Sequence, residues 1–436
     1  MLAVLYSLNL VAAFALTFVP LWFSKRYLKL PWLNPYSIAL AVTLPVQLMK
    51  LFAGPLLLLE EGGLFDPAYQ FAVLMGSLLA VAQATGLVFF FQLFKAMRIE
   101  WHLPFQSRSI SRKALRRAAR LLLLIFAIAL LLLASAEFGI QNWLANPREG
   151  YQLYRTGQGH WYAIATSTLG ASFLLYFLAR PQPGAVLMRT LVFLAFGYLL
   201  GSKFVLISIF AAGVTYLWFI HWRHLTKFLI FGMPFVFALA IWNLYLGIGA
   251  DFELLTLVQY FDYYKNAADY YRMYLSGELP LFHGEILWTS LWSYVPRAVW
   301  TEKPVVYGVI IINEIFYPGA AELTMTPAFG GAVEQFADFG VIGVLLFGFL
   351  GPQALVVALL SYLIFVRPGF NLERMSMGMV AALVVQFAPA YGLYFPGALY
   401  VVLLGITMIV IAIGRVGWLP RGSRGVRSGR TRARVP

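Results

Sequence analysis

The sequence predicts an all-α, polytopic membrane protein, and three observations support that prediction. Hydrophobic residues fill 61% of the 436 positions, whereas charged residues fill only 11%. A soluble domain ordinarily contains about 25% charged residues. The mean hydropathy is +0.77, and the apolar residues form long continuous runs without the alternation of a β-barrel strand. A soluble enzyme and a disordered chain are therefore excluded, and helices remain as the spanning element.

Eleven apolar segments are predicted to span the membrane, since a span needs about 20 residues. They are residues 2–22, 36–59, 69–94, 119–136, 161–179, 185–200, 204–220, 228–248, 339–365, 376–392 and 394–414. The first segment is expected to be retained, because no charged region precedes it and no clear cleavage signal follows it. The apolar run over 185–220 is divided at Gly201, Ser202 and Lys203. One helix of that length would exceed a bilayer core of about 30 Å and bury the lysine.

Basic residues are concentrated in the loops on one side of the predicted membrane. These loops hold 24 of the 32 Lys and Arg but only two acidic residues, Glu100 and Glu373. Because cytoplasmic loops are enriched in Lys and Arg, this side is predicted to be cytoplasmic and the amino terminus external. Topology then explains most of the net charge of +14. Nucleic-acid binding is not expected, and the basic tail is expected to contact anionic lipids.

The chain is expected to have four parts. These are eight spans over 1–248, a structured external loop over 249–338, three spans over 339–414 and a disordered cytoplasmic tail over 415–436. Within the loop, the tyrosine-rich stretch 260–274 fits an amphipathic helix at the membrane surface. The apolar stretch 305–317 is too short to span and is expected to be interfacial or re-entrant. One long loop without an internal repeat fits an enzyme better than a symmetric transporter.

Basic residues on the external side depart from the charge bias and therefore need a reason. The loop 249–338 holds eleven acidic and four basic residues, so each cation is either an ion-pair partner or a ligand for an anion. A guanidinium group suits phosphate because it donates two parallel hydrogen bonds. The candidate phosphate ligands are Arg148, Arg155, Arg272 and Arg297, with Lys203 near the outer boundary.

Acid–base candidates occupy the same external face. Glu334 lies just before the span 339–365, where partial desolvation would raise its pKa and make it a better base. A helix cap or an ion pair is the alternative role for Glu334, and His283 is the second candidate base. Further acid–base groups on this face are His160, Glu285, Glu302, Glu314 and Asp338.

Tyr264 and Tyr271 are candidates for stacking against sugar rings. The alternative is that they anchor an amphipathic helix at the membrane surface. The acidic residues of this face are scattered, so a metal site is not expected, and no cofactor is expected.

Two motifs stand out, Val-Pro-Arg-Ala-Val-Trp-Thr-Glu-Lys-Pro over 295–304 and Glu-x-x-x-x-Phe-Gly-x-x-Gly over 334–343. They resemble motifs of the Wzy-type O-antigen polymerases, which belong to a superfamily that also contains the O-antigen ligases. Gly-Ser-Lys at the turn over 201–203 also resembles these polymerases and the related ligases. Some polymerases carry two external motifs with Arg, ten residues and then Gly, and here Arg148 with Gly159 and Arg297 with Gly308 fit that spacing.

The resemblance implies an inverting glycosyltransferase of the GT-C type in the bacterial inner membrane, active on the periplasmic face. It would join oligosaccharide repeat units carried on undecaprenyl pyrophosphate, with a chain-length regulator protein as a further partner. Ligases often place a His shortly before the Gly-x-x-Gly span, where this chain has Phe329 and Gly330, which favours a polymerase. The alternatives are an O-antigen ligase, another lipid-linked glycosyltransferase, or a flippase or exporter of lipid-linked oligosaccharide.

The charge bias predicts the sidedness of each loop. Reporter fusions after residues 105, 225 and 425 should be cytoplasmic, and fusions after residues 150 and 275 should be external, because basic loops stay inside. A cytoplasmic signal after residue 275 would contradict an external site in the long loop.

Overall fold

A computed structural model of the chain describes most residues up to 362. The described ranges are 2–30, 51–97, 112–136, 139–153, 159–179, 182–202, 222–248, 262–322 without 296 and 298, and 327–362, with scattered positions in 32–44 and 205–217. The expected spans 36–59 and 204–220 are therefore described only in part. The expected spans 376–392 and 394–414 and the tail 415–436 lie outside the described residues.

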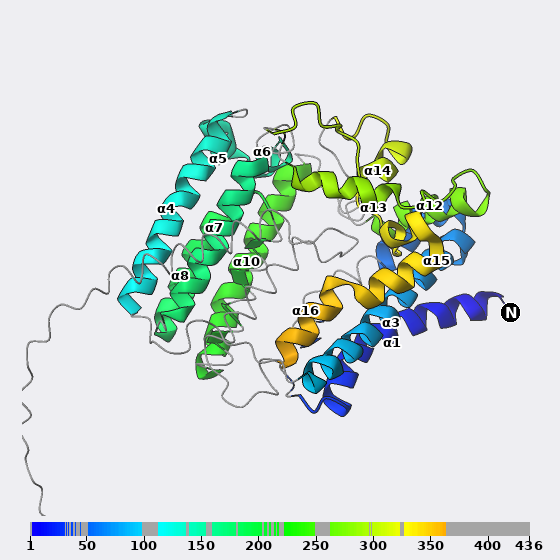
Figure 1. Cartoon of the computed structure of the whole chain (residues 1–436), viewed down its shortest axis with the longest axis horizontal. Coiled ribbons are helices and arrows are strands. Elements are labelled where there is room, and N and C mark those ends of the chain that lie inside the picture. The colour runs from blue at the N-terminus through cyan, green and yellow to red at the C-terminus, as the bar shows by residue number, and fades with distance from the viewer. Residues whose placement is uncertain are drawn as a thin grey trace, which may run out of the picture.

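Every regular element in these ranges is a helix, which confirms the all-α prediction, and the helices form two groups that lie side by side (Figure 1). The first group contains α1 (Leu2–Arg26), α3 (Pro67–Ala96), α12 (Tyr263–Leu275), α13 (Glu285–Ser290), α14 (Ile310–Phe316), α15 (Val333–Leu350) and α16 (Pro352–Ser361). The second group contains α4 (Arg112–Ala136), α5 (Ile140–Ala145), α6 (Pro147–Leu153), α7 (Gly159–Leu178), α8 (Pro183–Tyr198) and α10 (Leu225–Ile248). Each group buries its own cluster of aromatic and aliphatic side chains.

Four of the described helices are long and apolar enough to cross a membrane. They are Val4–Arg26, Pro67–Ala96, Leu115–Ala136 and Val333–Leu350. The helices α7, α8 and α10 coincide with three further expected spans. The expected break near residue 201 is confirmed, because α8 ends at Tyr198 and a turn follows in which Gly201 has a φ of 66°.

The expected single span over 339–365 is corrected by the structure, which divides it between α15 and α16. Gly351 is extended, with φ −57° and ψ 146°, and Pro352 begins the next helix. Proline disfavours the helical conformation in the residue before it and lacks an N–H for the helical ladder, so the helix ends there. A second irregularity, at Gly340 with φ 61°, lies inside α15.

The helix α3 is the centre of the first group and packs against α1, α12, α15 and α16. Asp66 caps its first turn by accepting hydrogen bonds from Ala68 N and Tyr69 N, and Pro67 follows at the first helical position. A Cβ atom at Gly86 would lie 2.0 Å from the carbonyl oxygen of Phe349. The backbones of α3 and α15 therefore touch, as small residues allow between membrane helices.

The two ends of the molecule differ in their elements. Basic helix ends lie at the lower end in Figure 1, including the end of α1 and the start of α4. The short helices α5, α6, α13 and α14 lie at the opposite end (Figure 1). Which end faces the cytoplasm stays a prediction from the charge of the loops.

Candidate functional site

The first part of the candidate site is the start of α15, which carries Glu334. This side chain is half-buried and lies in the first turn of the helix. Three hydrogen bonds join α12 to the preceding segment: Gly330 N to Tyr263 O at 2.6 Å, Asn266 Nδ2 to Ala328 O at 3.0 Å, and Tyr271 OH to Gly331 O at 2.6 Å. The helix α12 therefore determines where α15 begins and where Glu334 lies.

Asp338, one turn after Glu334, holds the helix α13 against α15. Its buried carboxylate accepts hydrogen bonds from Gly284 N and Ile286 N at 3.1 Å each and from Leu287 N at 2.7 Å. The N–H groups at the start of a helix lack partners within that helix, and here a carboxylate from another helix supplies them. The expectation that Asp338 is an acid–base group is corrected, because its carboxylate is a structural cap.

His283 lies in the turn that Asp338 stabilises. Its backbone N–H donates to the backbone carbonyl oxygen of Asp338 at 3.1 Å, its φ is 51°, and its side chain is exposed. A positive φ is uncommon for a residue other than glycine, and Gly284 follows with a φ of 97°. The position of the imidazole therefore depends on the contact between this turn and α15.

The second part of the site is a loop over residues 295–308, which we name the cation loop after Arg297 and Lys303. The guanidinium of Arg297 donates to the carbonyl oxygens of Lys303 and, at 3.0 Å, of Pro304. Lys303 Nζ donates to Val295 O at 3.1 Å and lies 4.5 Å from the centroid of the Tyr307 ring. The two cations thus close the loop on itself through backbone carbonyls.

Gly308 ends the cation loop and attaches it to α13. Its N–H donates to Thr289 Oγ1 at 2.8 Å, its φ is 59°, and a Cβ there would lie 2.6 Å from Ser290 Oγ. Only glycine accepts both constraints without strain. The spacing of Arg297 and Gly308 therefore has a structural meaning: the arginine binds the carbonyls that precede the glycine turn.

The cation loop carries positive charge that no acidic side chain among the described residues neutralises. Within the described residues, neither Arg297 nor Lys303 forms an ion pair with a carboxylate. Lys303 is only 6% exposed, and burial together with nearby Arg297 lowers its pKa from 10.5 to about 8. Since an unfolded lysine stays charged to higher pH, this burial costs stability below pH 8, and the cost diminishes as the pH rises further. Both side chains retain N–H donors that could bind an anion.

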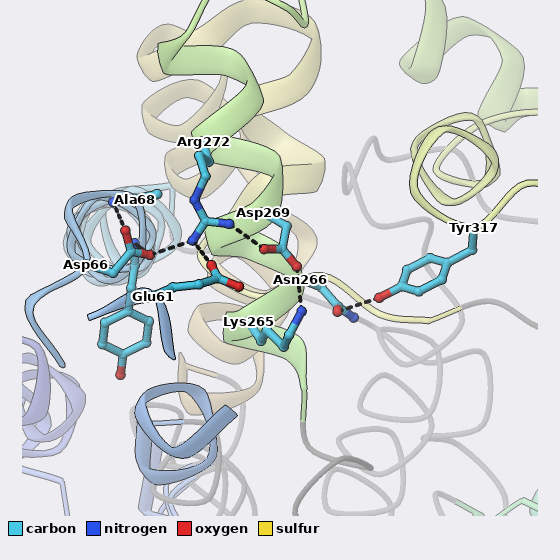
Figure 2. A network of polar contacts seen from close by, with 9 residues as sticks. Glu61, Asp66, Ala68, Lys265, Asn266, Asp269, Arg272 and Tyr317 are labelled. Carbon is cyan, nitrogen blue, oxygen red and sulfur yellow. Dashed lines mark hydrogen bonds and ion pairs between the residues drawn. The ribbon is translucent and has the colours of Figure 1, made fainter. Parts of the chain in front are cut away.

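Arg272 lies outside this site, in a network of three carboxylates (Figure 2). It forms ion pairs with Glu61, with Asp66 at 3.1 Å and with Asp269 at 2.8 Å. Burial lowers the pKa of Arg272, but Asp66, Glu61 and Asp269 together raise it above its ordinary value. The structure therefore favours the ion-pair role over phosphate binding, and Arg272 joins α12 to the start of α3.

Tyr264 and Tyr271, the candidates for stacking against sugars, lie inside the protein. The helix expected over 260–274 is present as α12, but Tyr264 is 8% exposed and Tyr271 is fully buried. The Tyr271 ring packs edge-on against Phe336 at 5.1 Å and Phe71 at 5.0 Å between ring centroids. Packing against protein side chains thus favours a structural role for these rings over stacking against a sugar.

The remaining predicted phosphate ligands belong to other parts of the chain. Arg148 lies half-buried on α6, and Gly159 is the first residue of α7. Arg155 and Lys203 lie outside the described residues. The helix α6 lies at the same end of the molecule as α13 (Figure 1). The joint action of Arg148 and Arg297 on a pyrophosphate stays a prediction.

Two residues with unusual environments were missed by sequence reasoning. Lys303 was one cation among eight outside the basic loops, and nothing in the sequence indicated that it would be buried. Asp262 is the N-cap residue that precedes α12, and burial raises its pKa to about 6 although Asn266 and Lys265 lower it. Asn266 also accepts a hydrogen bond from Tyr317 OH at 2.7 Å (Figure 2). A carboxylate with a raised pKa is a candidate base.

The described residues contain no cluster of side chains suited to bind a metal ion. Among the described residues, no group of three or more His, Cys, Asp or Glu side chains could hold a metal ion. The cations of the cation loop are the groups suited to an anionic ligand.

The chain is similar to two curated proteins, both named O-antigen polymerase, from Salmonella typhimurium strain LT2 and from Salmonella typhi. Each is 27% identical to it over 245 residues, which is 55% of this chain and 58% of the relative. The chain thus spans little more than half the length of these relatives. The match confirms the resemblance that the sequence motifs indicated. No protein-family profile and no solved structure matches the chain.

The cap on α13 predicts a specific effect of Asp338→Asn. Hydrogen bonds to a charged acceptor contribute about 1.5–3 kcal/mol, so this variant should lose stability of that order and expose residues 283–308 to protease. Thermal unfolding in detergent and limited proteolysis would measure both effects. The control is Glu285→Gln on the exposed side of α13, which should change stability by less than about 1 kcal/mol. Equal behaviour of the two variants would show that the cap is not needed.

Proposed function

We propose that this chain polymerises a surface polysaccharide. In this proposal it joins oligosaccharide repeat units carried on undecaprenyl pyrophosphate, by inverting glycosyl transfer of the GT-C type, on the periplasmic face of the bacterial inner membrane. The similarity to two O-antigen polymerases over 245 residues is the observation that carries the proposal. The unneutralised charge of the cation loop supports it, because the leaving group of this reaction is an anion.

The chemistry of the leaving group explains why cations are needed. Pyrophosphate is a weak base and leaves without a general acid, provided that its developing negative charge is stabilised. Arg297 and Lys303 are positioned to stabilise it, and their backbone contacts hold them in place before the substrate arrives. Arg148, on α6 in the other group of helices, is proposed to contribute further charge, and so are Arg155 and Lys203.

The acceptor hydroxyl needs a base, and we assign that role to Glu334. Its helix also carries Asp338, so Glu334 and the cation loop share one rigid support. His283 is the second candidate because it is exposed in the adjoining turn, and Asp262 is the third because of its raised pKa. A base within hydrogen-bond reach of the acceptor is sufficient for this step.

The partners follow from the reaction. The substrate is a lipid-linked oligosaccharide held in the membrane, and a separate regulator protein is proposed to set the length of the product. The residues present at the place where ligases often have a His, Phe329 and Gly330, favour polymerisation over ligation.

Deletion of the gene tests the activity. We expect surface lipid capped with a single repeat unit, because ligation continues when polymerisation stops. Analysis of the surface glycolipid by gel electrophoresis would show this pattern, and the intact gene supplied in trans should restore long chains. Loss of all capping would instead indicate a ligase or a flippase.

Charge-preserving substitutions test the phosphate site. Arg297→Lys and Arg148→Lys should each cut polymer formation roughly 30- to 1,000-fold, since a lysine cannot replace a two-point contact that contributes about 2–4 kcal/mol in the transition state. Arg272→Lys is the matched control and should leave polymer formation near normal, because a lysine keeps the positive charge with which the surrounding carboxylates pair. Near-normal polymer from Arg297→Lys and Arg148→Lys, at equal protein in the membrane, would place the pyrophosphate elsewhere.

Paired amide substitutions test the base. Glu334→Gln should abolish polymer formation. Asp262→Asn also replaces a carboxylate by an amide in the same loop, but this variant should preserve polymer formation. The raised pKa of Asp262 means that its ionised form destabilises the fold above pH 6, so the amide should keep or increase stability at pH 7. Polymer yield and thermal unfolding measure the two effects. Activity lost only in Asp262→Asn would assign the base to Asp262.

A further inference from the structure

The helix α13 and the cation loop expose an unusual amount of apolar surface. Three of the twelve tryptophans of the chain lie within residues 288–300. Trp288 on α13 is 67% exposed, and Val299 in the cation loop is 78% exposed. Leaving such side chains in water is unfavourable, so their exposure calls for a partner.

The position of α13 along α15 indicates what that partner is. Phe282 N donates to Ala337 O at 2.9 Å, and a Cβ at Gly284 would lie 3.2 Å from the Phe339 ring. The outward apolar surface of α15 begins at this level. It consists of the exposed side chains of Phe339, Val341, Ile342, Leu345 and Leu346. Because α15 is apolar enough to cross a membrane, a bilayer that surrounds this surface would have its boundary at the level of α13.

The composition of the segment fits the same boundary. Trp292 packs edge-on against Trp300 with 5.3 Å between ring centroids, and Lys303 Nζ lies over the Tyr307 ring. Tryptophan and tyrosine concentrate at the membrane–water interface because their rings are apolar with one polar atom.

We infer that α13 and the cation loop form a membrane-interface anchor, in which Trp288 and Val299 insert into the lipid surface at the Val333 end of α15. The occupant of this face is the boundary between the headgroups and acyl chains of the bilayer. The anchor holds Arg297 and Lys303 at the level of the lipid headgroups. The inference rests on the exposed surface and on the span α15, and it does not require the proposed enzymatic activity.

The absence of cysteine from the chain allows a direct test. Trp288→Cys and Val299→Cys each introduce a single thiol that a nitroxide spin label can modify. The control is Glu278→Cys, at an exposed position after α12 in the same loop. The full chain is reconstituted into vesicles of phosphatidylcholine and phosphatidylglycerol. Collision rates with oxygen, which concentrates in the bilayer, and with a water-soluble nickel chelate are then measured by electron paramagnetic resonance.

We expect the ratio of oxygen to nickel collisions to be several-fold higher at positions 288 and 299 than at position 278. Equal ratios at the three positions would place the segment in water and overturn the inference. Low collision rates with both reagents at 288 and 299 would show that another part of the protein covers this face, which would overturn it as well. Because both residues are exposed, neither substitution removes a buried contact.

Discussion

The candidate site depends on the carboxylate of Asp338. Burial of this charge is costly, and three N–H groups at the start of α13 offset the cost by satisfying both oxygens. The carboxylate in turn supplies acceptors for N–H groups that have no partner within the short helix. Through Thr289 the helix then holds Gly308, and through Gly308 it holds the cation loop. One contact between α13 and α15 therefore positions His283, Arg297 and Lys303 relative to a membrane-spanning helix.

Two kinds of cation occur in the long loop, and their neighbours distinguish them. Arg272 contacts three carboxylates, which neutralise its charge, and these ion pairs join α12 to the start of α3. Arg297 and Lys303 contact backbone carbonyls, which orient the side chains without neutralising them. Only the second arrangement keeps a charge available for an anionic ligand. Burying Lys303 without a carboxylate costs stability, and such a cost is typical of residues retained for function.

The proposed reaction and the proposed anchor place similar demands on the cation loop. A lipid-linked pyrophosphate lies at the membrane surface, so the cations that bind it must be held at that level. The aromatic side chains around Trp292 provide an apolar support for them, and α15 provides a rigid one. The helix α6, which carries Arg148, lies at the same end of the molecule (Figure 1).

The sequence by itself determined the helical class, most of the described helices and the resemblance to polymerases. These features depend on local properties, namely the length of apolar runs, the charge of short loops and contiguous motifs. The break between α15 and α16 was not predicted, although Gly351 followed by Pro352 is a local signal for the end of a helix. Only the tertiary structure decided the role of each charged residue. Arg272 meets Asp66 across 206 positions, and Asp338 meets Gly284 across 54. Whether a carboxylate acts as a cap, a base or an ion-pair partner depends on the groups that folding brings to it, and the one-dimensional order of residues does not contain those distances.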